Sequence, residues 1–278
     1  MNPLEFEFMQ RAFVACIVIA AVAPLVGSFI VQRGQSLVGD GMGHVAFAGV
    51  GLAFLVGADP VLGALAFTVL AGLLLVRMGR AGLAGDLAIA LIFYGGIAVG
   101  YLFASRANAG QTRLVGLLFG SPLNLTWSQV WVIVALAAAV VVVTVVLYPR
   151  LVALAFDEQA ARVAGVPTDR LVMALTLMVA LVVVGGMSSI GLLLISAMMV
   201  VPVAAAAQLA SSYRSTLWIG SGVGASSAAL GLLASHYRDY APASAIVLVA
   251  IVWYLAASGW RAATRRASRR AAAAGLGV

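Results

Sequence analysis

Stretches without any charged side chain recur along this sequence and are long enough to cross a lipid bilayer. A hydrocarbon core about 30 Å thick needs ~20 apolar residues in a helix, and about 17 to 25 are tolerated. Only 9% of the residues are charged and 64% are hydrophobic, whereas roughly a quarter are charged in soluble domains. These properties predict an integral membrane protein and exclude disordered, nucleic-acid-binding and secreted disulfide-rich proteins. The gaps that each fit one helix are 12–32, 41–58, 60–76, 87–105, 215–237 and 240–260.

Two longer gaps each contain a turn signal. The gap 114–149 is interrupted by Gly-Ser-Pro at 120–122, and the gap 171–213 must hold two helices separated at 185–189. Paired glycines and serines at the second break favour a turn over a continued helix. We therefore predict an all-α, polytopic membrane bundle that forms a single domain over 1–278. The expected spans lie near 12–32, 43–58, 60–76, 87–105, 127–147, 170–185, 189–210, 215–234 and 242–260.

The number of helices depends on the second and third spans, which only Asp59-Pro60 separates. One of them can be a partial or re-entrant helix instead of a full crossing. The prediction is therefore about nine (eight to nine) transmembrane helices.

The arginines predict how the helices are oriented, because short cytoplasmic loops are enriched in positive charge. An outside amino terminus places twelve arginines inside and four outside, and the reverse arrangement is less favourable. The inside group is Arg33, Arg77, Arg80, Arg150, Arg162, Arg170, Arg214, Arg261, Arg265, Arg266, Arg269 and Arg270, and the outside group is Arg11, Arg106, Arg113 and Arg238. The cytoplasmic tail, about 261–278, is expected to be solvated and partly disordered, with contact to anionic lipid as the alternative.

All 16 basic residues are arginine, so the chain contains no phosphate-binding loop of the G-x-x-x-x-G-K-[ST] type. Any ATP hydrolysis linked to this protein needs a separate subunit.

Asp40 and His44 are candidate metal ligands at the start of the second span. Their spacing of four residues places both side chains on one helical face, about 6 Å apart along the axis. Mixed oxygen and nitrogen ligands suit Zn²⁺ or Mn²⁺ and match Cu(I) poorly. In the structural alternative, the helix dipole favours Asp40 in the first turn and His44 is hydrogen-bonded in the core.

His236 and Asp239 form a second polar group, which the predicted topology places at the outer mouth. They are candidates for a relay that receives the incoming ion, or for a site that docks a partner. The alternative is a surface cluster in which Asp239 pairs with Arg238 and His236 lies at the membrane interface.

The longest inside loop, about 150–169, contains a predicted short helix. Asp157 and Glu158 fit a first helical turn, and Gly165 followed by Pro167 fits its end. A helix lying across the membrane face can receive force from a soluble partner. The residues assigned to this contact are Phe156, Asp157, Glu158, Ala161 and Gly165, and an ordinary connector is the alternative.

Four segments in this order resemble the zinc/manganese ATP-binding-cassette importer family (ABC-3), and the zinc-uptake type in particular. Gly39-Asp40 through His44 resembles the family's Gly-Asp-Ala-x-Ser-His segment, and 117–121 resembles its Leu-Phe-Gly-Ser segment. The loop 156–166 resembles its ATPase-coupling loop, and 191–204 resembles its most recognisable segment.

This resemblance implies a permease of the plasma or inner membrane that moves a divalent metal ion as substrate and holds no permanent cofactor. Zinc is the expected ion, and manganese and iron are alternatives because the same ligands serve all three. The implied partners are a second permease copy, two cytosolic ATPase subunits and an extracytoplasmic metal-binding protein, with no nucleic acid. Asp40 and His44 match positions that line the metal path in the family.

Two other functions compete with this interpretation. A proton-coupled secondary transporter would use Asp40 as its carrier group, but no chain of acidic residues crosses the spans. An intramembrane hydrolase would use Ser235 or Ser196 with a histidine. Ser235 and His236 are adjacent and point to different helix faces, and the sequence contains no Gly-x-Ser-x-Gly elbow.

Overall fold

A computed structural model describes residues 5–83, 85–106, 116, 118–238 and 240–273, and this part of the chain is helical without strands. Within these described residues, eight helices are long and apolar enough to cross a membrane, and α9 is a further apolar helix of 18 residues. The predicted polytopic all-α bundle is therefore confirmed. The helices are α1 (Glu7–Gln32), α2 (Val38–Val56), α3 (Pro60–Arg80), α4 (Gly85–Arg106), the 3-10 turn η2 (Pro122–Asn124), α6 (Trp127–Phe156), α7 (Glu158–Val163), α8 (Thr168–Met187), α9 (Leu192–Leu209), α10 (Tyr213–Arg238) and α11 (Pro242–Ala273).

The second and third spans are both full helices, α2 and α3, and local signals explain the break between them. Gly57 ends α2 in the left-handed conformation, which glycine adopts without a steric penalty. Asp59 then caps α3, because its carboxylate accepts hydrogen bonds from the backbone N–H groups of Val61 and Leu62. Pro60 occupies the first helical position, where its missing N–H costs nothing.

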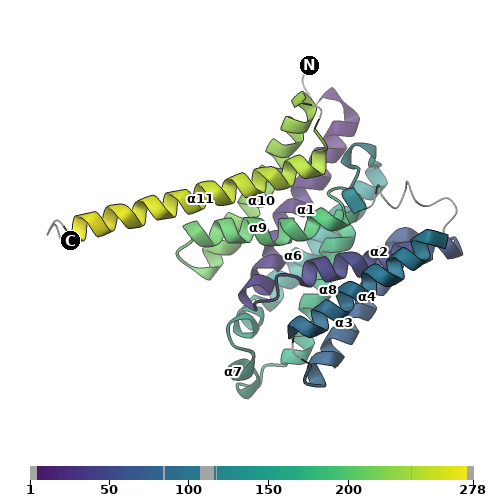
Figure 1. The fold of residues 1–278 in the computed structure, drawn as a ribbon, viewed down its shortest axis with the longest axis horizontal. Coiled ribbons are helices and arrows are strands. Elements are labelled where there is room, and N and C mark those ends of the chain that lie inside the picture. Colours follow the sequence, from purple (N-terminus) through teal and green to yellow (C-terminus); the bar gives the residue numbers. More distant parts are fainter. Residues whose placement is uncertain (1–4, 84, 107–115, 117, 239, 274–278) are drawn as a thin grey trace.

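Two boundaries differ from the prediction. The helix α8 continues through Gly185 and Gly186, and the turn lies at 188–191, about two residues later than expected. Helical backbone satisfies its own hydrogen bonds in a membrane, so glycines inside a packed helix need not end it. The arginine-rich tail was expected to be partly disordered, but α11 continues as a helix to Ala273. Figure 1 shows this end of α11 projecting away from the bundle.

The helices pack as two groups. α2, α3 and α4 lie side by side, and α1 packs against α6, α8, α9 and α10, with contacts of α2 to α9 and of α3 to α8 joining the groups (Figure 1). Gly49 and Gly63 bring α2 and α3 together, because a Cβ on Gly49 would lie 2.2 Å from the carbonyl oxygen of Gly63. In the apolar 18-residue stretch of each helix, 67% of the residues are buried in α1, α2 and α8, against 22–28% in α3, α4, α6 and α11. The second set exposes apolar side chains as a lipid-facing surface does.

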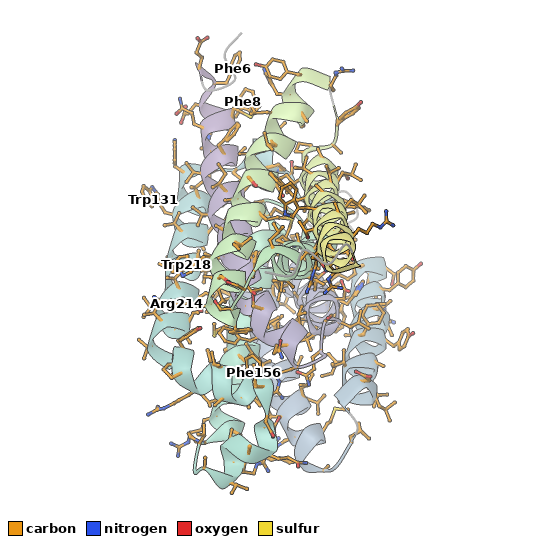
Figure 2. The ribbon with its side chains drawn as sticks, turned by 90° about the vertical axis from the view of Figure 1, so that its left-hand side faces the viewer. Phe6, Phe8, Trp131, Phe156, Arg214 and Trp218 are labelled. Carbon is orange, nitrogen blue, oxygen red and sulfur yellow. The ribbon has the colours of Figure 1, made fainter. Side chains whose placement is uncertain are left out.

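Contacts at the two ends of the bundle agree with the predicted grouping of loops. At one end, Arg33 pairs with Glu158 and Arg80 pairs with Asp169. At the other end, the Trp127 indole donates a 2.7 Å hydrogen bond to Glu7. Figure 2 shows Phe6 and Phe156 at opposite ends of the molecule. These contacts show which loops share an end of the bundle, but not which end faces the cytoplasm. That direction rests on the arginine count and remains a prediction.

Candidate metal centre

Asp40 lies in the first turn of α2, where the partial positive charge of the helix N-terminus favours a carboxylate. Its side chain and that of His44, one turn further, line the same cavity. The structure therefore brings the two predicted ligands together on one wall.

α9 approaches this wall closely. A Cβ on Gly39 would lie 3.1 Å from the Cβ of Ser196, so a glycine keeps the two helices in contact. The Ser196 hydroxyl donates a hydrogen bond to Oδ1 of Asp40. This bond holds the carboxylate in one orientation and leaves Oδ2 for another partner. Groups that orient a ligand in this way commonly tune metal affinity.

The His44 imidazole packs edge-on against Phe93 of α4, with ring centroids 4.7 Å apart and an interplanar angle of 84°. The contact restricts the ring to one side of the cavity. An imidazole nitrogen presented from a fixed ring is suited to metal coordination.

A further carboxylate, Asp86 of α4, also lines the cavity. The cavity has a volume of about 480 Å³, many times the ~30 Å³ that one water occupies in the liquid. An ion held by Asp40 and His44 can therefore keep part of its water. The described residues contain no group of three or more His, Cys, Asp or Glu close enough to hold an ion together. The remaining residues that line the cavity are Gly34, Gln35, Ser36, Leu37, Ile89, Ala90 and Tyr94.

His236 does not belong to this cavity. It lies near the end of α10, where its ring is 6.5 Å from that of Phe6 and 5.3 Å from that of Tyr237. Asp239 lies outside the described residues. Their proposed role as an outer relay therefore remains a prediction.

The predicted short helix is present as α7. The Asp157 carboxylate caps it by accepting a 2.9 Å hydrogen bond from the Ala160 N–H. Gly165 follows the helix with φ +80°. Glu158 forms ion pairs with Arg33 and Arg162. The helix start and stop signals are confirmed.

Two of the residues assigned to the coupling contact point in different directions. Ala161 is buried against the protein itself, at 5% exposure, so it supports α7 and cannot contact a soluble partner directly. Phe156 is largely exposed, and its ring lies 5.4 Å from that of Tyr213. Val163 is 91% exposed and was not assigned from the sequence. The available sequence signal was an apolar valine at the end of a short helix that was predicted to lie outside the membrane.

Sequence reasoning also missed Asp86 and the role of Ser196. Asp86 marked only the boundary of a charge-free gap. The available signal was topological, because α2 and α4 begin at the same end of the bundle and each has a carboxylate in its first turn. Ser196 was considered only as a nucleophile, since nothing local connects it with Asp40.

Comparison with known proteins agrees with this architecture. Residues 5–260 match the family described as the ABC 3 transport family. The chain is 32% identical over 252 residues to the manganese import system permease protein ScaB of Streptococcus gordonii, covering 90% of each chain. It is 30% identical over 255 residues to the manganese transport system membrane protein MntC of Listeria innocua serovar 6a, covering 91% of each.

A solved structure has the same fold. PsaBC from Streptococcus pneumoniae in complex with Fab superposes with a TM-score of 0.82 at 32% sequence identity, covering 91% of this chain and 92% of that one. The relatives are named as a permease protein and a membrane protein of transport systems, and this chain is a permease of the same kind. Because the family match extends over almost the whole chain, this protein belongs to the ABC 3 transport family.

Proposed function

We propose that this chain is one of two permease copies in an ATP-driven importer that carries a divalent metal ion into the cytoplasm by alternating access. The observation that carries the proposal is the cavity that Asp40, His44 and Asp86 line together. An isolated carboxylate is disfavoured in a low-dielectric interior, whereas a divalent ion offsets its charge. A divalent ion in transit is therefore expected to bind at this position.

Mn²⁺ is the first candidate for the transported ion. The sequence alone led us to expect zinc, and oxygen and nitrogen ligands serve both ions. The names of the relatives ScaB and MntC refer to manganese import and manganese transport, which favours Mn²⁺. Zn²⁺ and Fe²⁺ are the competitors that a transport experiment must include.

The partners in this proposal are two cytosolic ATPase subunits, an extracytoplasmic metal-binding protein and a second copy of the permease. The exposed side chains of α7, above all Val163, support an ATPase contact at this end of the bundle. The outer relay through His236 and Asp239 is a further part of the proposal, because a metal-binding protein delivers its ion at the opposite end.

The competing hydrolase gains no support from its serines. The Ser235 hydroxyl donates a 2.6 Å hydrogen bond to the carbonyl oxygen of Tyr240, and that of Ser196 donates to Asp40. The hydrolase was expected to use a histidine as the base that accepts the proton of its nucleophile, whereas these two bonds go to a carbonyl oxygen and to a carboxylate.

Uptake by reconstituted vesicles tests the proposal. The vesicles contain the permease with its ATPase subunits facing the lumen, and the binding protein is added outside. They should accumulate Mn²⁺ when ATP is enclosed in the lumen. Unlabelled Zn²⁺ and Fe²⁺ added in turn rank the ions by competition. Accumulation that needs no ATP but follows a proton gradient would instead identify the secondary transporter.

A further inference from the structure

Arg33 ends α1 and is buried although it lies at the end of the bundle. Its side chain is 11% exposed, and a guanidinium withdrawn from water is costly unless it is paired and hydrogen-bonded. The partners of Arg33 therefore explain why a cation is kept at this position.

Three elements of the fold supply those partners. Nη2 of Arg33 lies 2.8 Å from Oε2 of Glu158, in the first turn of α7. Nη1 donates a 3.3 Å hydrogen bond to the carbonyl oxygen of Leu154 near the end of α6. Nε donates a 3.3 Å hydrogen bond to Oε1 of Gln35 in the turn between α1 and α2. Because the guanidinium is planar and rigid, one side chain holds all three elements in a fixed relation.

Gln35 connects this contact to the candidate metal cavity, because it lines that cavity together with Ser36 in the turn before α2. We call this part of the lining the inner edge, after the predicted inside end of the bundle. The backbone N–H of Gln35 donates to Ile30 at 3.0 Å, and its carbonyl oxygen accepts from Val38 at 3.0 Å. The turn is thus tied to both helices, and Asp40 lies in the next turn of α2. A displacement of Gln35 is therefore expected to move the part of the cavity lining to which it belongs.

α7 is placed to cause such a displacement. It is six residues long and packs mainly on the ends of α6 and α8. Figure 1 shows it at the margin of the molecule. Of the four ion pairs among the described residues, that between Arg33 and Glu158 joins α7 to α1.

We propose that Arg33 is the positioning residue that transmits movement of α7 to the inner edge of the metal cavity, through Glu158 on one side and Gln35 on the other. The inference rests on the proposed function, in which an ATPase moves α7. Such a link couples two sites when the connecting element has two arrangements and each site favours one of them. Arg33 holds the cavity edge in the arrangement described here, and movement of Glu158 releases it.

A neighbouring ion pair provides a matched control. Nη2 of Arg80 lies 2.9 Å from Oδ2 of Asp169, at the same end of the bundle, and joins α3 to α8. Both side chains are exposed, at 61% and 43%, and neither residue lines the metal cavity. Exposed pairs of this kind contribute little to stability.

The experiment uses the complete transporter in vesicles and measures Mn²⁺ uptake per ATP hydrolysed, together with Mn²⁺ binding to the permease. Arg33→Gln breaks the link at its centre, and Gln35→Met breaks its far end while leaving the ion pair with Glu158. Each should lower uptake per ATP about tenfold, within the usual range of coupling between linked sites. Because Arg33 itself does not line the cavity, Arg33→Gln should leave Mn²⁺ binding within about twofold, well below that coupling. Arg80→Gln should change neither quantity by more than about twofold. Asp169 is left unchanged because it also pairs with Arg162 of α7.

A readout independent of the ion separates this inference from the proposed function. A cysteine at Ser36, on the cavity edge, should react with a thiol reagent at a rate that ATP changes when Arg33 is present and does not change in Arg33→Gln. Exchanging the charges, with Arg33→Glu and Glu158→Arg together, should restore part of the ATP response that either change alone abolishes. If wild-type vesicles show the ATP response but carry no divalent ion, the transport proposal fails and the link stands.

Two results would overturn the role of Arg33. Unchanged uptake per ATP and an unchanged ATP response in both Arg33→Gln and Gln35→Met would show that α7 acts by another route. Loss of Mn²⁺ binding in parallel with uptake would show that Arg33 only maintains the folded cavity. Because Gln35→Met keeps the partly buried ion pair of Arg33 and Glu158, its uptake per ATP and its ATP response still test the link where Arg33→Gln assembles poorly.

Discussion

The hydroxyl of Ser196 in α9 donates a hydrogen bond to Oδ1 of Asp40 in α2, joining two residues 156 positions apart in the chain. The bond orients the carboxylate beside the imidazole of His44, and it also holds α9 against the cavity wall. Metal affinity should therefore depend on a residue that is not itself required as a ligand.

We predict that Ser196→Ala lowers the apparent affinity for Mn²⁺ by about tenfold, the lower end of the effect expected when an orienting partner of a metal ligand is removed. Uptake measured across a range of Mn²⁺ concentrations, at equal expression, tests this. Ser227→Ala is the matched control, since this buried serine in α10 bonds only within its own helix, to the Val223 carbonyl oxygen at 2.7 Å. Equal effects of the two substitutions would assign Ser196 to packing.

Asp40 and His44 should act as one site. Asp40→Asn keeps the shape and removes the charge, and His44→Gln keeps a polar group without the imidazole nitrogen. Each change should depress uptake at limiting Mn²⁺ by at least about tenfold, and the double variant should lose little more, because contacting residues are not additive. Near-normal uptake by either single variant would leave Asp40 as a helix-terminal residue and His44 as a packing residue. Asp86→Asn, in α4, measures how far the second carboxylate contributes.

The arginine count predicts an outside amino terminus and an inside carboxyl terminus. Single cysteines introduced at Glu5 and Ser268 should react with a membrane-impermeant reagent from outside and from inside, respectively. The native Cys16 is buried and should contribute little background. Labelling of position 268 from outside would reverse the assigned direction of every helix.

The helices could be predicted from sequence because a bilayer imposes a simple rule on each one separately. A span must be apolar and must satisfy its own backbone hydrogen bonds, so charged residues and turn signals mark its limits. Asp59-Pro60 illustrates this, since Asp59 caps α3 and Pro60 is its first residue, where the sequence predicted the span to begin. Gly185 and Gly186 illustrate the limit of the rule, because packing keeps both inside α8.

The rest of the site depends on which helices become neighbours, and no local pattern contains that information. The i,i+4 spacing predicted that Asp40 and His44 share a face, but Ser196 and Asp86 join them only through the packing of α9 and α4. Arg33 and Glu158, which form a partly buried ion pair, are 125 residues apart in the chain. Arg33 could be predicted to lie inside, but its partner could not be identified.

Val163 should contribute to the ATPase contact because it is an apolar side chain that the permease itself leaves 91% exposed. Val163→Asp should reduce Mn²⁺-stimulated ATP hydrolysis by about tenfold, since charge is disfavoured at the buried centre of an interface. Val163→Ile keeps the apolar contact and should behave like the wild type. This substitution is a cleaner test than changing Asp157 or Ala161, which cap and support α7. Full stimulation in Val163→Asp would move the contact to another part of the loop.

His236 and Asp239 should affect access of the ion from outside more than its binding in the cavity, because His236 lies at the end of α10 beside Phe6 and away from Asp40 and His44. His236→Ala and Asp239→Ala together should raise the external Mn²⁺ concentration needed for half-maximal uptake, while Mn²⁺ binding to the purified permease stays the same. Phe6→Leu is the control for the aromatic packing that the histidine substitution also removes. A concentration dependence that is unchanged in the double variant would make His236 an interfacial packing residue. A shift of the same size in Phe6→Leu would assign the effect to the packing of the helix end.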